Sequence, residues 1–61
     1  DPAKAKPWLV PAGTSGLYEA DECCTDNGHV YRNNYPNNEF SPSALPDRWT
    51  DLGTTEDIQK D

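Results

Sequence analysis

Two aromatic residues stand at the ends of a proline-stiffened segment, Phe40 to Trp49, which reads Phe-Ser-Pro-Ser-Ala-Leu-Pro-Asp-Arg-Trp. Proline fixes φ and lacks an amide donor, so neither a helix nor a central strand runs easily through Pro42 and Pro46. We therefore expect a preset loop that holds a flat ring in place as a platform for an apolar, ring-shaped ligand. We assign Phe40 to this platform and Trp49 to the core. The alternative is that both rings belong to the core of a domain too small to spare an aromatic.

A second aromatic residue and several amides lie just before this segment. Residues 33–39 read Asn-Asn-Tyr-Pro-Asn-Asn-Glu, and four asparagines with a proline favour a loop. A sugar ring packs its C–H groups on an aromatic face, while its hydroxyls take amide partners. We therefore predict a ligand-binding set of four residues, Tyr35, Asn38, Phe40 and Pro42. The alternative is a solvated loop that binds nothing.

Two acidic residues, Glu22 and Asp26, invite comparison with the catalytic pair of a glycosidase. Such carboxylates flank a substrate cleft about 5–10 Å apart, and a chain of 61 residues has little room for a cleft. His29 has no nucleophile at a suitable spacing, and the sequence contains no Gly-rich phosphate loop. We therefore predict a domain that is not itself an enzyme.

The two cysteines, Cys23 and Cys24, are adjacent and lie among acidic residues, with His29 nearby. Neighbours on a strand point to opposite faces, whereas a zinc site needs about four converging ligands, usually with Cys-x-x-Cys spacing. We expect no metal, no cofactor and no disulfide within this pair, with one thiol buried and the other exposed. We assign His29 instead to a cross-strand pair with Asp26.

Length and charge limit the core and the partners. A single domain of 61 residues buries only about 60% of its unfolded surface. Because large aliphatic residues are few, we expect aromatic residues to form the core, namely Trp8, Tyr18, Tyr31 and Trp49. The net charge of −6 disfavours nucleic acid and favours a neutral ligand. No apolar run approaches the ~20 residues that span a bilayer, so we expect no membrane insertion.

The dipeptide Asn27-Gly28 predicts a hairpin. It separates Cys23-Cys24-Thr25-Asp26 from His29-Val30-Tyr31-Arg32, and both of its residues accept the positive φ of a type I′ turn. A two-residue turn pairs Asp26 with His29, and the pairs follow outward to residues 23 and 32. The pair of Cys24 and Tyr31 is expected on the core face, and the pair of residues 25 and 30 on the other.

The remaining signals divide the chain into three parts. Residues 1–6 read as the end of a linker, residues 7–53 as the domain, and residues 54–61 as a frayed tail in which Thr55 is a possible helix N-cap. Residues 8–10 predict a brief edge strand between prolines, and residues 49–52 predict a last strand that ends at Gly53. The chain as a whole predicts an all-β fold, a small twisted antiparallel sheet of short strands with long Pro/Asn-rich loops.

The order of the motifs carries a resemblance. A Trp, a Tyr and an acidic residue precede Asn-Gly-x-x-Tyr and aromatic-x-Pro-Ser-x-x-Pro-x-x-Trp, and the matching residues are Trp8, Tyr18, Glu22, Asn27, Gly28, Tyr31, Phe40, Pro42, Ser43, Pro46 and Trp49. This pattern resembles the carbohydrate-binding modules of families 5 and 12, small chitin-binding domains appended to bacterial chitinases. A variant found in phage virion and tail proteins has a Pro-Trp start, a Pro-x-Gly loop and an Asn-Asn-x-aromatic-x-Pro run, as in residues 7–8, 11–13 and 37–42. Phe40 stands where the family commonly has Trp.

The resemblance implies a fold and a function. The family's fold is a small, twisted antiparallel sheet, which agrees with the strands expected above. Its function would be non-catalytic attachment of a larger protein, such as a secreted chitinase or another glycoside hydrolase, to chitin or a related polysaccharide. The variant implies an alternative, a structural or host-glycan-recognition domain of a phage virion or tail protein. In both cases the partner is a polysaccharide or a cell-surface glycan, and the domain is covalently part of a larger extracellular or virion protein.

Overall fold

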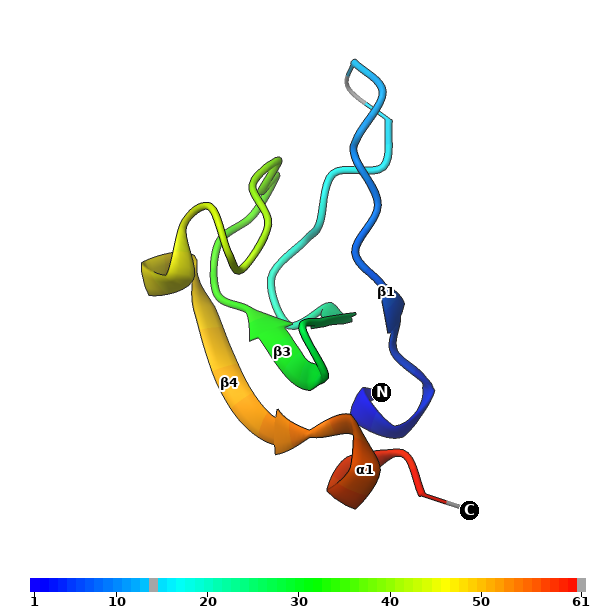
Figure 1. Cartoon of the computed structure of the whole chain (residues 1–61). Coiled ribbons are helices and arrows are strands. Elements are labelled where there is room, and N and C mark those ends of the chain that lie inside the picture. The colour runs from blue at the N-terminus through cyan, green and yellow to red at the C-terminus, as the bar shows by residue number, and fades with distance from the viewer. Residues whose placement is uncertain (14, 61) are drawn as a thin grey trace.

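A computed structural model describes residues 1–13 and 15–60 and contains one four-stranded sheet (Figure 1). The strands are β1 (Lys6–Pro7), β2 (Cys23–Asp26), β3 (His29–Asn33) and β4 (Trp49–Thr54), in the spatial order β1-β2-β3-β4. The expectation of a small β domain is confirmed, but the sheet is mixed, because β1 runs parallel to β2 while the other pairs are antiparallel. A parallel neighbour requires a long crossover, and residues 8–22 supply it.

The central hairpin forms as the sequence predicts. Asp26 pairs with His29, and the register continues outward to the pair of Cys23 and Arg32. Asn27 and Gly28 have φ values of 51° and 78°, so both turn residues adopt the positive φ of a type I′ turn. The turn and the register therefore follow from local sequence alone.

The antiparallel pairing of β3 with β4 contains an irregularity between Val30 and Tyr31, which face Gly53 and Asp51 respectively. The Nδ1 atom of His29 lies 3.1 Å from a carboxylate oxygen of Asp51. The expected pairing of His29 with Asp26 therefore holds for the backbone only, because β4 brings a second carboxylate within reach of the ring. The last strand also runs through Gly53, where φ is 128°, and ends one residue later than this glycine.

The first strand differs in place from the expected one. It comprises Lys6–Pro7 rather than residues 8–10, and the amide of Trp8 donates to the carbonyl of Thr25 at 3.0 Å. Leu9 and Val10 then leave the sheet and are 71% and 79% exposed. β1 pairs through only two residues, with a strand that is distant in the sequence. The apolar character of residues 8–10 therefore predicted the strand at the wrong position.

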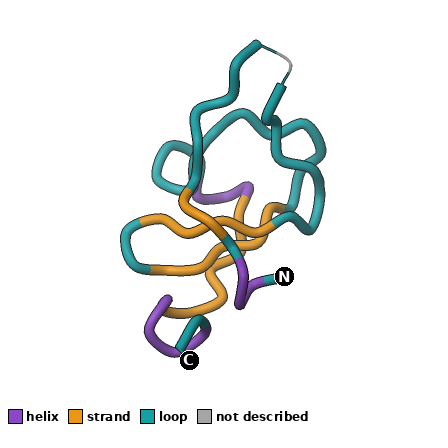
Figure 2. Tube along the Cα trace, turned by 90° about the vertical axis from the view of Figure 1, so that its right-hand side faces the viewer, coloured by secondary structure: helices purple, strands orange, loops and turns teal. Residues whose placement is uncertain are grey.

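The two ends of the chain contact each other, where we expected a linker end and a frayed tail. Residues Pro2–Lys4 form a short 3₁₀ helix, and α1 spans Thr55–Ile58. The Nε2 atom of Gln59 donates to the carbonyls of Pro2 and Ala5 at 3.1 and 2.8 Å, and Figures 1 and 2 show the two segments side by side. The helix N-cap is Thr54, one residue before the expected Thr55, and its side chain accepts from the amide of Asp57. No helix among residues 1–13 and 15–60 is long and apolar enough to cross a membrane.

Both faces of the sheet are covered. Cys24 and Val30 are fully buried, although adjacent cross-strand pairs point to opposite faces. The expectation that only the Cys24 and Tyr31 face is the core is therefore wrong. Among the four aromatics assigned to the core, Trp49 is buried, and Trp8, Tyr18 and Tyr31 are half-buried. The rings of Tyr18 and Trp49 meet edge to face, with centroids 5.4 Å apart and planes at 68°.

Replacing Gly28 tests the turn. Gly28→Val places a β-branched side chain at a positive φ, which such residues rarely adopt. We expect a loss of about 1–3 kcal/mol in the free energy of unfolding, measured by urea titration. The matched control is Gly28→Asn, because asparagine tolerates positive φ, and it should lose less. Equal stability of Gly28→Val and the parent would contradict the turn.

Acid titration tests the contacts of Asp51. The amide of Gly53, followed by the His29 side chain, holds the pKa of the Asp51 carboxyl below its usual value. A carboxyl with a depressed pKa in the folded state adds stability that is complete above its unfolded pKa of about 3.9 and is lost as the pH falls through the folded value.

We therefore expect the urea midpoint of unfolding, followed by circular dichroism, to decrease when the pH is lowered below about 4. This decrease should be larger for the parent than for Asp51→Asn. The control Asp47→Asn removes a different exposed acid and leaves Asp51 intact. Its unfolding midpoint should decrease at low pH as much as that of the parent. The same acid response in Asp51→Asn and the parent would remove the link to Asp51.

Candidate functional site

The residues predicted to bind a ligand lie on the loop between β3 and β4 (Figure 1). Asn33 ends β3, Trp49 begins β4, and these two residues are Cα partners in the sheet. A short 3₁₀ helix, Pro46–Arg48, leads into β4. The loop is thus fixed at both ends by one pair of neighbouring strand residues.

Asn33 is fully buried and connects this loop to the preceding one. Its Nδ2 atom donates to the carbonyls of Tyr18 and Glu19, both at 2.9 Å, and to the carbonyl of Tyr35. Its Oδ1 atom accepts from the Tyr35 amide at 3.2 Å and from Nδ2 of Asn38 at 2.8 Å. One side-chain amide therefore satisfies groups from two loops that no strand ladder reaches.

Asn38 is the second fully buried asparagine. Its backbone pairs with that of Tyr18 in both directions, at 2.8 and 3.0 Å. Its Oδ1 atom accepts from the Phe40 amide at 2.9 Å. Asn38, predicted as a ligand contact, therefore has no free surface, and it positions Phe40 instead. Pro42, the other non-aromatic member of the predicted set, is also buried.

Phe40 and Tyr35 are the two members of the predicted set that reach the surface. They are 39% and 48% exposed. The carbonyl of Phe40 accepts from Nε1 of the buried Trp49 at 3.0 Å, so the backbone of Phe40 is held on one side by Asn38 and on the other by Trp49. Sequence reasoning had placed Phe40 at the surface and Trp49 in the core, and the two residues lie so.

Arg48 completes the surface and was missed from the sequence. The Cζ atom of its guanidinium lies 4.7 Å from the centroid of the Tyr35 ring and 5.6 Å from that of the Phe40 ring. These distances are within the range of cation–π attraction. The side chain is half-buried, and the carbonyl of Arg48 accepts from the amide of Asn34 at 2.9 Å. The signal in the sequence that could have identified Arg48 is its position directly before Trp49, at the end of a loop that contains two other aromatic residues. We call Tyr35, Phe40 and Arg48 the ring surface.

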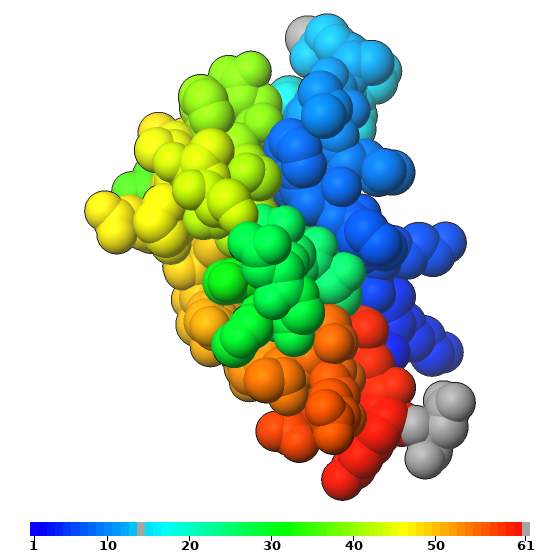
Figure 3. Space-filling model, in the orientation of Figure 1, coloured from blue at the N-terminus to red at the C-terminus, as the bar shows by residue number. Residues whose placement is uncertain are grey.

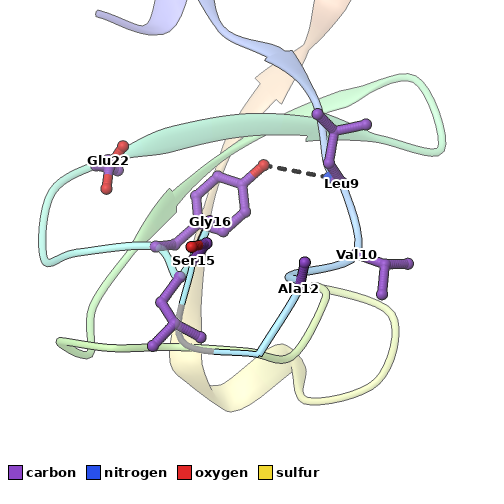
Figure 4. Close-up of a pocket in the computed structure, with 8 residues that line it drawn as sticks. Leu9, Val10, Ala12, Ser15, Gly16 and Glu22 are labelled. Atoms are coloured by element: carbon purple, nitrogen blue, oxygen red, sulfur yellow. Dashed lines mark hydrogen bonds between the residues drawn. The ribbon is translucent and has the colours of Figure 1, made fainter.

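Two adjoining hollows, of about 410 and 370 Å³, lie elsewhere and share Leu9, Tyr18 and Glu22. Figure 4 shows Leu9 and Glu22 on opposite sides of the first hollow. The hydroxyl of Tyr18 accepts from the Leu9 amide at 3.3 Å, and burial raises the pKa of this hydroxyl despite that bond. Neither hollow includes a residue of the ring surface, so we base the candidate site on the exposed rings and not on these hollows.

The residues considered for catalysis or metal binding take part in local contacts. A carboxylate oxygen of Glu22 accepts from the amide of Glu19 at 2.7 Å, and one of Asp26 accepts from the hydroxyl of Ser43 at 2.7 Å. Cys23 and Cys24 are free thiols, and burial raises the pKa of the Cys24 thiol to about 12. Within residues 1–13 and 15–60, no three His, Cys, Asp or Glu side chains converge as metal ligands. Comparisons with protein-family models, curated proteins and solved structures found no match.

Exchanging the buried amide for a carboxylate tests the role of Asn33. Asn33→Asp keeps the shape but replaces the Nδ2 donor by an oxygen that faces the carbonyls of Tyr18, Glu19 and Tyr35. A buried charge without a partner costs about 3–5 kcal/mol, which approaches the whole stability of a small domain. We expect the variant to be largely unfolded at 25 °C by near-ultraviolet circular dichroism.

The neighbouring amide provides the matched control. Asn34 is exposed, and among the described residues its side chain exchanges hydrogen bonds only with the hydroxyl of Thr50, at 2.9 and 3.1 Å. A carboxylate can still accept from that hydroxyl, so Asn34→Asp should lose about 0.5 kcal/mol or less. Similar losses for the two variants would remove Asn33 from its central role.

Proposed function

We propose that this chain is a non-catalytic carbohydrate-binding module of the chitin-binding type, which attaches a larger protein to chitin or a related polysaccharide. The observation that carries the proposal is the pair of exposed rings, Tyr35 and Phe40, on a loop held by buried amides. A pyranose ring has C–H groups on its faces that pack against aromatic carbon. Two rings on one loop provide contact area for successive sugar units of a chain.

The fixed backbone of the loop supports this proposal, because little conformational entropy is then lost when a ligand binds. A ligand-binding loop that is mobile before binding loses conformational freedom when the ligand arrives. Here the Phe40 backbone is hydrogen-bonded to Asn38 and Trp49, and the Tyr35 amide to Asn33. The aromatic residues are thereby placed before a ligand binds, which suits recognition of a flat polysaccharide surface.

The ring surface provides aromatic contact area for a ligand, and none of its three residues carries a carboxyl group. Its only ionisable groups are the guanidinium of Arg48 and the Tyr35 hydroxyl. The two carboxylates considered for catalysis, Glu22 and Asp26, take part in local hydrogen bonds with Glu19 and Ser43. We therefore propose that any hydrolysis is performed by another domain of the parent protein, which would be secreted.

A second candidate is a structural or host-glycan-recognition domain of a phage virion or tail protein. The observation that favours it is the exposure of two adjacent aliphatic residues, Leu9 and Val10, on a segment that projects beyond the sheet (Figures 1 and 3). Neighbouring subunits of a particle would cover such a segment. The flanking domains of the parent distinguish the two candidates, a catalytic barrel favouring the first and tail repeats the second.

Truncation of Phe40 tests the proposed function. Phe40→Ala removes the ring but leaves the backbone groups that bond to Asn38 and Trp49. An aromatic contact contributes about 0.5–1.5 kcal/mol beyond its buried area, so we expect retention on the preferred polysaccharide to weaken roughly tenfold or more. The measurement is depletion from solution by insoluble chitin, cellulose and bacterial envelopes.

The matched control is Leu9→Ala, which removes another exposed apolar side chain outside the ring surface. It should bind as the parent does, and both variants should keep the parent's circular dichroism. Unchanged retention by Phe40→Ala would refute the binding role of this ring. Loss of the folded spectrum in that variant would assign Phe40 to the core.

A further inference from the structure

The guanidinium of Arg48 points to the class of sugar that the ring surface takes. We infer, on the basis of the proposed function, that the ligand is a polysaccharide whose sugar units carry a carboxylate, and that Arg48 is the residue that selects it. The expectation from net charge alone was a neutral ligand. The guanidinium of Arg48 lies close to two exposed rings, and this local positive charge favours an anionic ligand there.

Arg48 has no anionic partner in a chain rich in acids. The chain has 11 acidic and 5 basic residues, yet the described residues 1–13 and 15–60 form a single ion pair, His29 with Asp51. In the same residues, no side-chain hydrogen bond involves the guanidinium of Arg48. Its sequence neighbour Asp47, and Glu39 beside Phe40, are both exposed and do not pair with it. The charge of Arg48 is therefore positioned by aromatic rings and not by a carboxylate of this chain.

The contact with the rings leaves the N–H donors of the guanidinium without a side-chain hydrogen-bond partner among the described residues. Cation–π attraction draws the charge of the group to the ring faces and does not itself use the five N–H donors of the guanidinium in conventional hydrogen bonds. These donors form a fork that matches the two oxygens of a carboxylate. A sugar that packs on Tyr35 or Phe40 with a carboxylate at its ring edge would meet this fork.

The overall negative charge opposes but does not prevent this contact. Charges farther away than about 8 Å are largely screened at physiological ionic strength, so a short bidentate contact outweighs repulsion from acids on distant parts of the sheet. The exposed acids Asp47 and Glu39 are the sequence neighbours of Arg48 and Phe40 respectively. They disfavour a densely charged polymer more than one with carboxylates on alternate sugars.

Three tetrasaccharides that share N-acetylglucosamine separate the possibilities. They are a hyaluronan tetrasaccharide, its carboxyl methyl ester and a chitin tetrasaccharide, with a 6-phosphorylated chitin tetrasaccharide as a fourth probe. Using isothermal titration calorimetry on the intact domain, we expect the hyaluronan tetrasaccharide to bind roughly 10- to 100-fold more tightly than its ester, the range for a charge-assisted hydrogen-bonded contact.

Two substitutions of Arg48 assign the preference to its fork. Arg48→Gln should bring the affinity for hyaluronan down to that for the ester, and Arg48→Lys should keep only part of the difference because lysine is a point charge. The matched control is Arg32→Gln, which makes the same charge change at an exposed residue of β3 outside the ring surface and should preserve the preference. All variants are compared at equal folded fraction by circular dichroism.

The outcomes distinguish this inference from the proposed function. Equal binding of the hyaluronan and chitin probes, unchanged in Arg48→Gln, would overturn the inference and leave the proposed function intact. Tightest binding of the phosphorylated probe would also overturn it, since the site would then select phosphate. Binding of none of the four probes, together with no retention on any insoluble polysaccharide, would overturn both.

Discussion

The carboxamide of Asn33 is the constraint on which the rest of the structure depends. It lies at the end of β3 and bonds to Tyr18 and Glu19 in one loop and to Tyr35 and Asn38 in the next. Both loops run outside the sheet ladder, so their carbonyl groups need partners that water cannot supply inside the fold. A single buried amide meets this need with both donor and acceptor atoms, which is why the loops keep one relative position.

The amide contacts also compensate for a small apolar core. Among the apolar side chains of the described residues, only those of Cys24, Val30, Pro42 and Trp49 are buried, and a domain of this size is marginal on hydrophobic burial alone. Buried polar groups stabilise a structure only when they are satisfied, and Asn33 and Asn38 satisfy each other as well as backbone groups. The directional hydrogen bonds of Asn33 and Asn38 specify a loop geometry that so few buried apolar side chains would leave loosely defined.

The parts of the fold and the site that the sequence predicted are those set by neighbouring residues. Asn27-Gly28 determines its own turn, and the turn determines the register of β2 and β3. The parallel position of β1 could not be predicted, because it depends on a partner strand sixteen or more residues away in the chain and on only two residue pairs. The exposure of Tyr35 and Phe40 was predicted from a stiff polar loop.

The burial of Asn38 was not predicted, for a related reason. Asparagines in a polar loop usually face solvent and hydrogen-bond locally, and the sequence does not show that the amides of residues 33 and 38 meet in the interior. The same holds for Arg48, whose guanidinium reaches Tyr35 and Phe40 only after the loop has folded back on itself.

The register of β3 and β4 connects this core to the ring surface. Asn33 opposes Trp49, so the residue that anchors both loops lies beside the residue whose indole holds the Phe40 carbonyl. Arg48 ends the 3₁₀ helix that leads into β4, and its guanidinium reaches the rings of Tyr35 and Phe40, while the next residue, Trp49, is buried. A shift of this register by one residue would turn Trp49 to the other face of β4 and expose its indole. The burial of Trp49 is therefore a consequence of this pairing, and the same indole holds the Phe40 carbonyl beside the ring surface.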